Sequence, residues 1–200
     1  MDFRQLVLQN RSYRKYDQSK PISADTMRSI VEVSRYTASK LNLQTLKYFV
    51  SCTPVQNEKI FSKTRWAAPL KGYDGPQEGE KPTGYVVICG DSDTTPKVDT
   101  FDIDVGIVAQ TMTLYASSLG LGCCMILNFR KEELKALLQL PENLYPHLVV
   151  TFGTPDEKVV LVDMEKDGDP MYYRDAQQNH YVPKRKVEDL IVNPEYPTAD

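Results

Sequence analysis

Residues 102–122 of this 200-residue chain read DIDVGIVAQTMTLYASSLGLG and contain its most apolar helical pattern. In a helix over 102–119, apolar side chains would cover nearly the whole circumference: Ile103, Val105, Ile107, Val108, Met112, Leu114, Tyr115 and Leu119. A helix that is apolar all round is buried on all sides, either in a large core or against a partner subunit. The glycines at 120 and 122 are typical of a helix end. The pattern therefore predicts that this helix lies at the centre of the fold. It leaves open whether a second subunit covers part of the helix.

Strand and helix patterns alternate on both sides of this stretch. Apolar runs predict strands at 48–52, 85–89, 123–127, 148–152 and, less regularly, 159–162. Helical spacing of apolar residues predicts helices at 3–7, 24–36, 57–65 and 131–138, and a helical turn at 187–191. Ser23 is a suitable N-cap for the second of these helices, because its hydroxyl can accept a free backbone N–H.

Two segments lack a pattern that would build a core. Residues 72–84 read GYDGPQEGEKPTG, and a loop of this length is usually functional or mobile, although a plain surface excursion explains it equally well. After residue 156 the apolar pattern loosens, as in an arm that packs on a second subunit. We therefore expect one domain over residues 1–200, with residues 156–200 as a C-terminal arm on the partner.

The composition excludes several classes of protein. A net charge of -3 leaves no basic excess for general nucleic-acid binding. No apolar run approaches the roughly 18 residues of a membrane span, and the N-terminal residues MDFRQL lack a signal-peptide core, so we expect a cytoplasmic protein. The four cysteines match no zinc or redox spacing and there are two histidines, so no metal site is expected.

Four separated segments carry side chains that suit a bound phosphorylated ring compound. They are Arg11, Ser12 and Arg14; Ser39, Asn42 and Gln44; residues 120–128; and Lys184, Arg185 and Lys186. Cationic side chains pair with phosphate, and the neutral polar ones add hydrogen bonds. None of these segments places a nucleophile beside a base or forms a phosphate-binding glycine loop.

The same residues also have purely structural interpretations. Arg14 can pair with an acid at a helix end, Ser39 can cap a turn, and residues 184–186 can be a solvated charged run. Cys123 and Cys124 are expected to be core residues rather than redox centres.

Four motifs in order along the chain resemble those of the FMN-dependent nitroreductase family. They are NRSYRKY at 10–16, SKLNLQ at 39–44, Asp104 to Gln110 followed by Gly120 to Gly122, and GTP at 153–155. The resemblance extends from about residue 4 to about residue 190. It implies an α+β fold in which a central mixed, mainly antiparallel sheet is surrounded by helices, within an intertwined homodimer that has two FMN sites at its interface.

The resemblance also implies roles for individual residues. Arg11, Lys184 and Arg185 would hold the FMN phosphate, while Ser12 and Arg14 would face the pyrimidine edge of the flavin. A positive charge at that edge stabilises the reduced flavin. The neighbouring subunit would contribute Ser39, Asn42 and Gln44. One face of the flavin ring would lie against Met125, Ile126, Leu127 and Asn128. Many family members have glycine near position 128 and arginine at position 10, where this chain has asparagine at both.

The implied activity is that of an FMN-dependent oxidoreductase that uses NADPH or NADH. A hydride would pass to flavin N5, and an electron-poor acceptor such as a nitroaromatic or a quinone would then take the electrons in a ping-pong cycle. The flavin carries this chemistry, so no catalytic side chain is expected. From their positions, Trp66 and Tyr73 are candidates for the wall of the substrate pocket. One alternative is an enzyme of the same fold with a narrower reaction, such as enone reduction or reductive dehalogenation. The other is a flavin-binding or storage protein with little turnover.

Overall fold

The computed structural model describes residues 2–70, 72–94 and 101–193, and it divides into two compact units. The first unit comprises residues 1–66 and 74–156, and the second comprises residues 67–73 and 157–200. The C-terminal segment of the second unit thus begins at residue 157, one residue after the predicted start of the arm. The unit also includes residues 72–73 of the glycine-rich loop. Packing of this unit on a partner stays a prediction.

The first unit is built on a four-stranded sheet in which all neighbouring strands are antiparallel. The strands are β1 (Leu46–Ser51), β2 (Gly84–Asp91), β3 (Gly122–Ile126) and β4 (Leu144–Gly153), in the order β1-β2-β4-β3. Strand β2 is buried along its whole length, because it is central and covered on both faces. This explains why its sequence is a continuous apolar run rather than an alternating one.

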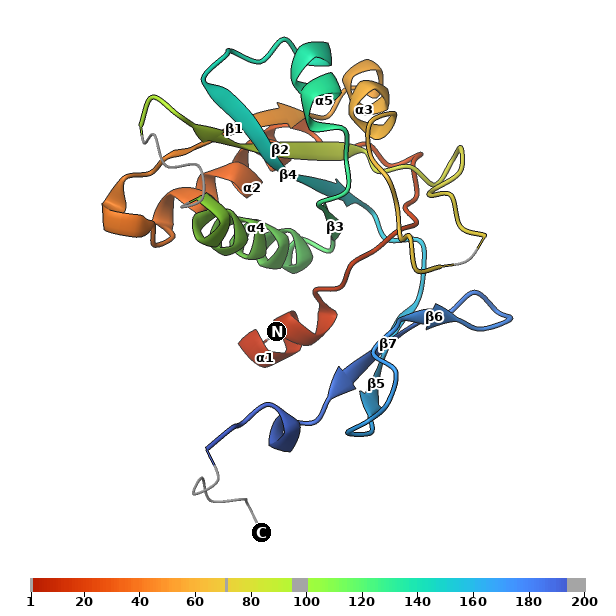
Figure 1. The fold of residues 1–200 in the computed structure, drawn as a ribbon. Helices are drawn as coiled ribbons and strands as arrows, with labels where there is room; N and C mark the ends of the chain where they lie inside the picture. The colour runs from red at the N-terminus through yellow and green to blue at the C-terminus, as the bar shows by residue number, and fades with distance from the viewer. Residues whose placement is uncertain (1, 71, 95–100, 194–200) are drawn as a thin grey trace. The chain divides into compact units, whose positions relative to one another are not determined.

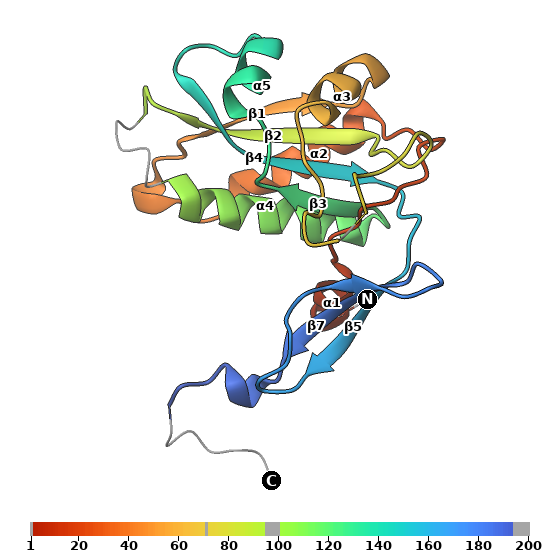
Figure 2. The same cartoon turned by 45° about the vertical axis from the view of Figure 1, so that its right-hand side comes forward.

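Helices cover both faces of this sheet (Figures 1 and 2). On one face lie α2 (Ala24–Glu32) and α4 (Phe101–Ser118), and on the other lie α3 (Pro54–Phe61) and α5 (Lys131–Leu137). The short helix α1 (Phe3–Gln9) lies beside α4. Ser23 caps α2 as predicted, since its side chain accepts a hydrogen bond from the backbone N of Thr26. The predicted helix 57–65 is displaced to 54–61, because Pro54 suits a first helical turn.

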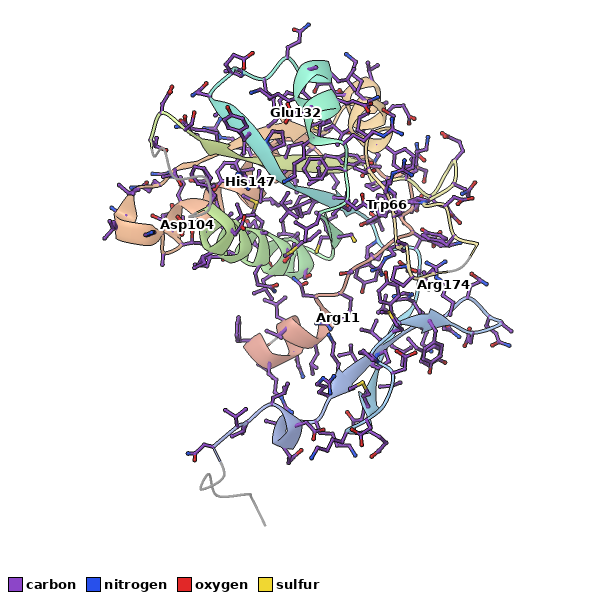
Figure 3. All side chains as sticks on the ribbon, viewed as in Figure 1. Arg11, Trp66, Asp104, Glu132, His147 and Arg174 are labelled. Carbon is purple, nitrogen blue, oxygen red and sulfur yellow. The ribbon has the colours of Figure 1, made fainter. Side chains whose placement is uncertain are left out.

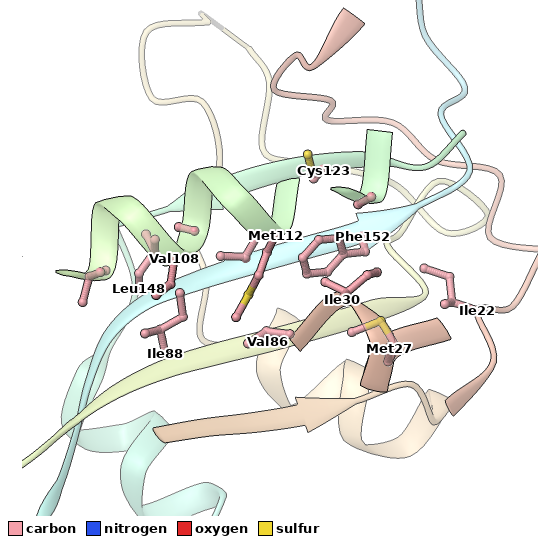
Figure 4. Packing of buried hydrophobic residues seen from close by; sticks show 14 of the residues in the cluster. Ile22, Met27, Ile30, Val86, Ile88, Val108, Met112, Cys123, Leu148 and Phe152 are labelled. Atoms are coloured by element: carbon pink, nitrogen blue, oxygen red, sulfur yellow. The ribbon is translucent and has the colours of Figure 1, made fainter. Parts of the chain in front are cut away.

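The main core lies between the sheet and the helices α2 and α4 (Figure 4). Its fully buried members include Met27, Ile30, Val86, Met112 and Phe152. The register explains this, because Val86 is paired with Val150 and Ile88 with Leu148, which places apolar side chains of both strands on the same face.

Helix α4 is buried on one side only within its own chain. Val105, Val108 and Met112 are buried against the sheet, whereas the side chain of Ile103 is 75% exposed and Gly106 is also exposed. The prediction of burial all round is therefore wrong for the isolated chain. Burial of the outer side of α4 against a partner subunit, the other alternative that the sequence left open, stays a prediction.

The second unit contains a three-stranded sheet of order β5-β7-β6. Strand β7 (His180–Arg185) pairs parallel with β5 (Val159–Met164) and antiparallel with β6 (Tyr173–Arg174), and a short 3-10 helix at Val187–Asp189 follows. Among the described residues of the chain, no helix combines the length and the apolar character needed to cross a bilayer.

Candidate functional site

The Arg11–Tyr16 segment lies along the edge strand β3. Ser12 forms a parallel bridge with Cys123, and the backbone N of Tyr13 donates a hydrogen bond of 2.9 Å to the carbonyl O of Cys123. Gly122 permits this approach, because a Cβ at that position would lie only 2.7 Å from the Tyr13 ring. Two regions that are more than 100 residues apart in sequence, both predicted to bind the same ligand, are thus adjacent.

Arg11 has a guanidinium group that is only partly matched by protein acceptors. Its Nη2 donates to the carbonyl O of Val7 at 2.8 Å, near the end of α1, whereas its Nε is buried and has no hydrogen-bond partner among the described residues. Burial lowers the pKa of Arg11 from its ordinary value. A buried cationic donor without an acceptor is costly, and a bound anion such as a phosphate would satisfy it.

Ser12 and Arg14 lie next along the same segment. Nη1 of Arg14 donates to the carbonyl O of Ser12 at 3.1 Å, so the guanidinium folds back over the serine main chain. The position of this cation therefore depends on how firmly the backbone from residue 12 to residue 16 is held.

Tyr16 fixes this backbone from inside the first unit, a role that the sequence analysis missed. Its ring is fully buried, and its hydroxyl bonds to the carbonyl O of Tyr13 at 2.7 Å and to Oγ1 of Thr151 at 2.9 Å. Burial raises the pKa of Tyr16 well above its ordinary value, so the phenol stays protonated. Gly153 leaves room for the ring, since a Cβ there would lie 2.6 Å from it. In the sequence, this packing is indicated only by Gly153 at the end of β4. The fold is needed to show that the ring beside this glycine is that of Tyr16.

Strand β3 continues into an exposed apolar edge. Met125 is 37% exposed and Leu127 is 74% exposed, and residues two apart in an extended chain point to the same side. Beyond them, the carbonyl O of Asn128 accepts a hydrogen bond of 2.8 Å from the backbone N of Arg65. Cys123 and Cys124 are buried, which confirms them as core residues, and burial raises the pKa of Cys123 to about 12.

A second group of predicted residues lies in the turn that precedes β1. The backbone N of Gln44 donates to Oγ of Ser39 at 3.3 Å, and Nε2 of Gln44 donates to Oδ1 of Asn42 at 3.4 Å. Leu41, Asn42 and Gln44 have φ angles of 52°, 55° and 52°. Left-handed backbone at non-glycine residues costs free energy and is concentrated at functional sites. Ser39 thus closes a turn, and its predicted contact with a ligand stays a prediction.

Asp104 supports this turn from α4. Its carboxylate is buried and accepts a hydrogen bond of 3.2 Å from the backbone N of Lys40. Asp104, Ser39 and Gln44 all line a pocket of about 220 Å³. The sequence motif that begins at Asp104 therefore supplies an anchor for the turn, which the spacing of the motif alone did not reveal.

The two groups of polar residues lie at different positions along α4, as Figure 3 shows for Arg11 and Asp104. Sγ of Cys123, beside Ser12, lies 3.9 Å from the carbonyl O of Thr113. Asp104 precedes Thr113 by nine residues, which is about 14 Å along a helix axis. One chain therefore does not bring both groups to the same point.

The remaining predicted residues are distributed over both units. Trp66 is buried in the first unit, where its Nε1 donates to Oγ1 of Thr64 at 3.0 Å. In the second unit, Tyr73 lies under the guanidinium of Arg174 and lines a pocket of about 400 Å³.

The C-terminal cations lie at the end of β7, in the second unit. Lys184 pairs with Asp163 and Arg185 with Met164 in the strand register, while Nζ of Lys186 forms an ion pair of 3.1 Å with Glu165. Their contacts with a ligand, like those of Trp66 and Tyr73, stay predictions.

Comparison with known proteins identifies the family of this chain. The model of the Nitroreductase family matches residues 7–154. A protein of Methanothermobacter thermautotrophicus, provisionally named NADH dehydrogenase/NAD(P)H nitroreductase, is 26% identical over 162 residues, which are 78% of this chain and 79% of that protein.

Two solved structures share the fold. A nitroreductase family protein of Clostridium difficile has a TM-score of 0.64 at 24% identity, covering 78% of this chain and 86% of that one. A Staphylococcus epidermidis protein, provisionally described as an NAD(P)H:FMN oxidoreductase, has a TM-score of 0.64 at 16% identity, covering 78% and 88%. The chain therefore belongs to the nitroreductase family and is an oxidoreductase.

Proposed function

We propose that this protein is an FMN-dependent NAD(P)H oxidoreductase that reduces small electron-poor acceptors such as nitroaromatics and quinones. The observation that carries the proposal is the buried, unmatched Nε of Arg11 beside Ser12 and the exposed apolar edge of β3. A cation and an apolar surface together suit a phosphorylated planar ring.

The residues present fit FMN by their chemistry. Arg11 would hold the phosphate through a charged hydrogen bond, and the same role for Lys184 and Arg185 stays a prediction from the sequence. Met125 and Leu127 would pack against the ring, and Ser12 and Arg14 would lie at its polar edge. The fold relative from S. epidermidis carries NAD(P)H:FMN in its name, which supports the same cofactor here.

Bound FMN would supply the redox chemistry, because it can accept a hydride from a nicotinamide and pass electrons to a second substrate. The residues of the protein would bind the FMN, orient its ring and adjust its reduction potential. Arg14 places a positive charge at the polar edge, and the buried thiol of Cys123 with its raised pKa takes no part as a nucleophile. The reaction is tested by adding NADPH or NADH to the FMN-loaded protein without oxygen and following the flavin absorbance.

We further propose that two copies of the chain complete each site. The turn at 39–44 is about 14 Å from the Ser12 region along α4, so it would serve the FMN of the partner. The first unit also exposes several large apolar side chains, namely Phe3, Leu8, Leu41, Ile103, Leu119 and Leu127. In the proposed homodimer, the second copy would cover at least part of this exposed apolar surface.

Ile103→Asp is expected to dissociate this homodimer and to lower FMN binding at least tenfold, because a buried, unpaired carboxylate is costly. The substitution lies in the first turn of α4, where an acidic residue suits the helix dipole, so the chain still folds. Light scattering gives the mass, and fluorescence titration gives the affinity for FMN.

Val55→Asp is the matched control. Val55 is 72% exposed in the first turn of α3, on the other face of the sheet, so this variant should remain dimeric and bind FMN normally. A monomeric Ile103→Asp protein with unchanged affinity for FMN would contradict the shared site.

A further inference from the structure

The loop at residues 76–83 contacts the Arg11–Tyr16 segment through Glu80. Its Oε1 forms an ion pair of 2.8 Å with Nζ of Lys15, and both side chains are about one quarter exposed, at 27% and 25%. Its carbonyl O accepts a hydrogen bond of 3.0 Å from the backbone N of Tyr16. The side chain and the main chain of Glu80 therefore hold two successive residues of the segment.

Glu80 is itself held in place by its own loop. Its Oε2 accepts from the backbone N of Gln77 at 3.2 Å, and its backbone N donates to the carbonyl O of Gln77 at 2.9 Å. The side chain of Gln18 joins the loop to the chain beyond the segment, since its Oε1 accepts from the backbone N of Gly79 at 2.9 Å and of Lys81 at 3.1 Å. These hydrogen bonds hold the backbone of the loop that carries the carboxylate of Glu80.

The opposite side of the segment is paired as well. The backbone N of Asp156 donates to the carbonyl O of Lys15 at 3.0 Å, and the backbone N of Asp17 donates to the carbonyl O of Thr154 at 2.9 Å. Lys15 to Asp17 therefore lies between the 76–83 loop and the end of β4. Arg14 directly precedes this doubly held stretch and follows Tyr13, which is bonded to β3.

We propose that Glu80 is a positioning residue for the cofactor: through Lys15 and Tyr16 it fixes the backbone that places Arg14 at the polar edge of the flavin. The inference rests on the proposed FMN site and assigns a role to the glycine-rich loop. A cation at that edge stabilises the reduced flavin more than the oxidised one. Loss of Glu80 should therefore weaken the binding of reduced FMN more than the binding of oxidised FMN.

Glu80→Gln tests this role, with Glu78→Gln as the matched control. Glu78 lies in the same loop and is 81% exposed, and its carboxylate pairs with Lys81 and accepts a long hydrogen bond of 3.5 Å from Nε2 of Gln18, outside the Arg11–Tyr16 segment. For Glu80→Gln we expect oxidised FMN to bind up to about fivefold more weakly, as for the loss of a partly exposed ion pair. The midpoint potential of the bound flavin should also fall. The fall is about 30 mV for each factor of ten by which the loss of affinity for reduced FMN exceeds the loss for oxidised FMN.

Two further measurements separate positioning from general stability. In the FMN-free protein, amide hydrogen exchange over residues 12–18 should be faster in Glu80→Gln than in Glu78→Gln. The charge-swapped double variant Lys15→Glu with Glu80→Lys should recover the potential. If Glu80→Gln does not fold, Lys15→Met removes the same ion pair from the other side and is expected to lower the potential equally.

Equal potentials in the Glu80 and Glu78 variants, or a loss of thermal stability without a change in potential or exchange, would overturn the role of Glu80. Failure of the unaltered protein to bind FMN would instead overturn the proposed function and this role with it. The two failures are therefore distinguishable in one set of titrations.

Discussion

Arg14→Glu is expected to weaken FMN binding by roughly 10- to 100-fold. A hydrogen bond that involves a charged group contributes about 1.5–3 kcal/mol, and an introduced carboxylate adds repulsion near the electron-rich pyrimidine edge. The guanidinium of Arg14 donates to the carbonyl O of Ser12, whereas the hydroxyl of Tyr16 bonds to Thr151 inside the core. Quenching of FMN fluorescence on titration with protein measures the dissociation constant.

Arg28→Glu is the control for this charge reversal. Arg28 is exposed on α2, and its substitution changes the net charge by the same amount. We expect its affinity for FMN to match that of the unaltered protein. If both variants bound FMN as tightly as the unaltered protein, Arg14 would have no role at the flavin.

Phe152→Ala is expected to lower the free energy of unfolding by about 3–5 kcal/mol, because it leaves a cavity that the surrounding core cannot fill. Phe152 is fully buried between the sheet and the helices α2 and α4 (Figure 4). Its main chain is also fixed, since its carbonyl O accepts a hydrogen bond of 3.0 Å from the backbone N of Thr83. Chemical denaturation followed by circular dichroism measures the loss.

Val55→Ala serves as the reference for this measurement. Val55 is 72% exposed, and a substitution at such a position usually changes stability by no more than about 0.5 kcal/mol. Losses of similar size in the two variants would show that the layer between the sheet and α4 is not the principal core.

The elements of the first unit were predictable because each has a strong local pattern. The apolar run at 85–89 and the helical spacing at 102–119 correspond to β2 and α4, and Ser23 caps α2 as its side chain suggests. Local periodicity, however, does not reveal which side of a helix faces its own sheet. The exposure of Ile103 therefore could not be predicted from the sequence, because it depends on the antiparallel packing of strands that are far apart in sequence.

The candidate site was predictable in its residue types but not in its supports. Arg11, Ser12 and Arg14 are recognisable as a cation-rich segment, but its position beside β3 is seen only in the fold. The contact of Glu80 with Lys15 links residues 65 positions apart, and no local pattern predicts it. Nor does periodicity predict the left-handed backbone at Leu41 and Asn42, which the carboxylate of Asp104 stabilises through Lys40.

The most direct test of the central claim is the anaerobic absorption spectrum of the FMN-loaded protein before and after addition of NADPH, and in a parallel sample NADH. We predict that at least one of the two nucleotides bleaches the visible flavin band, and that a nitroaromatic or a quinone then restores it. A protein that binds FMN but shows no bleaching with either nucleotide would contradict the oxidoreductase mechanism proposed here. A protein that cannot be loaded with FMN would contradict the cofactor assignment itself.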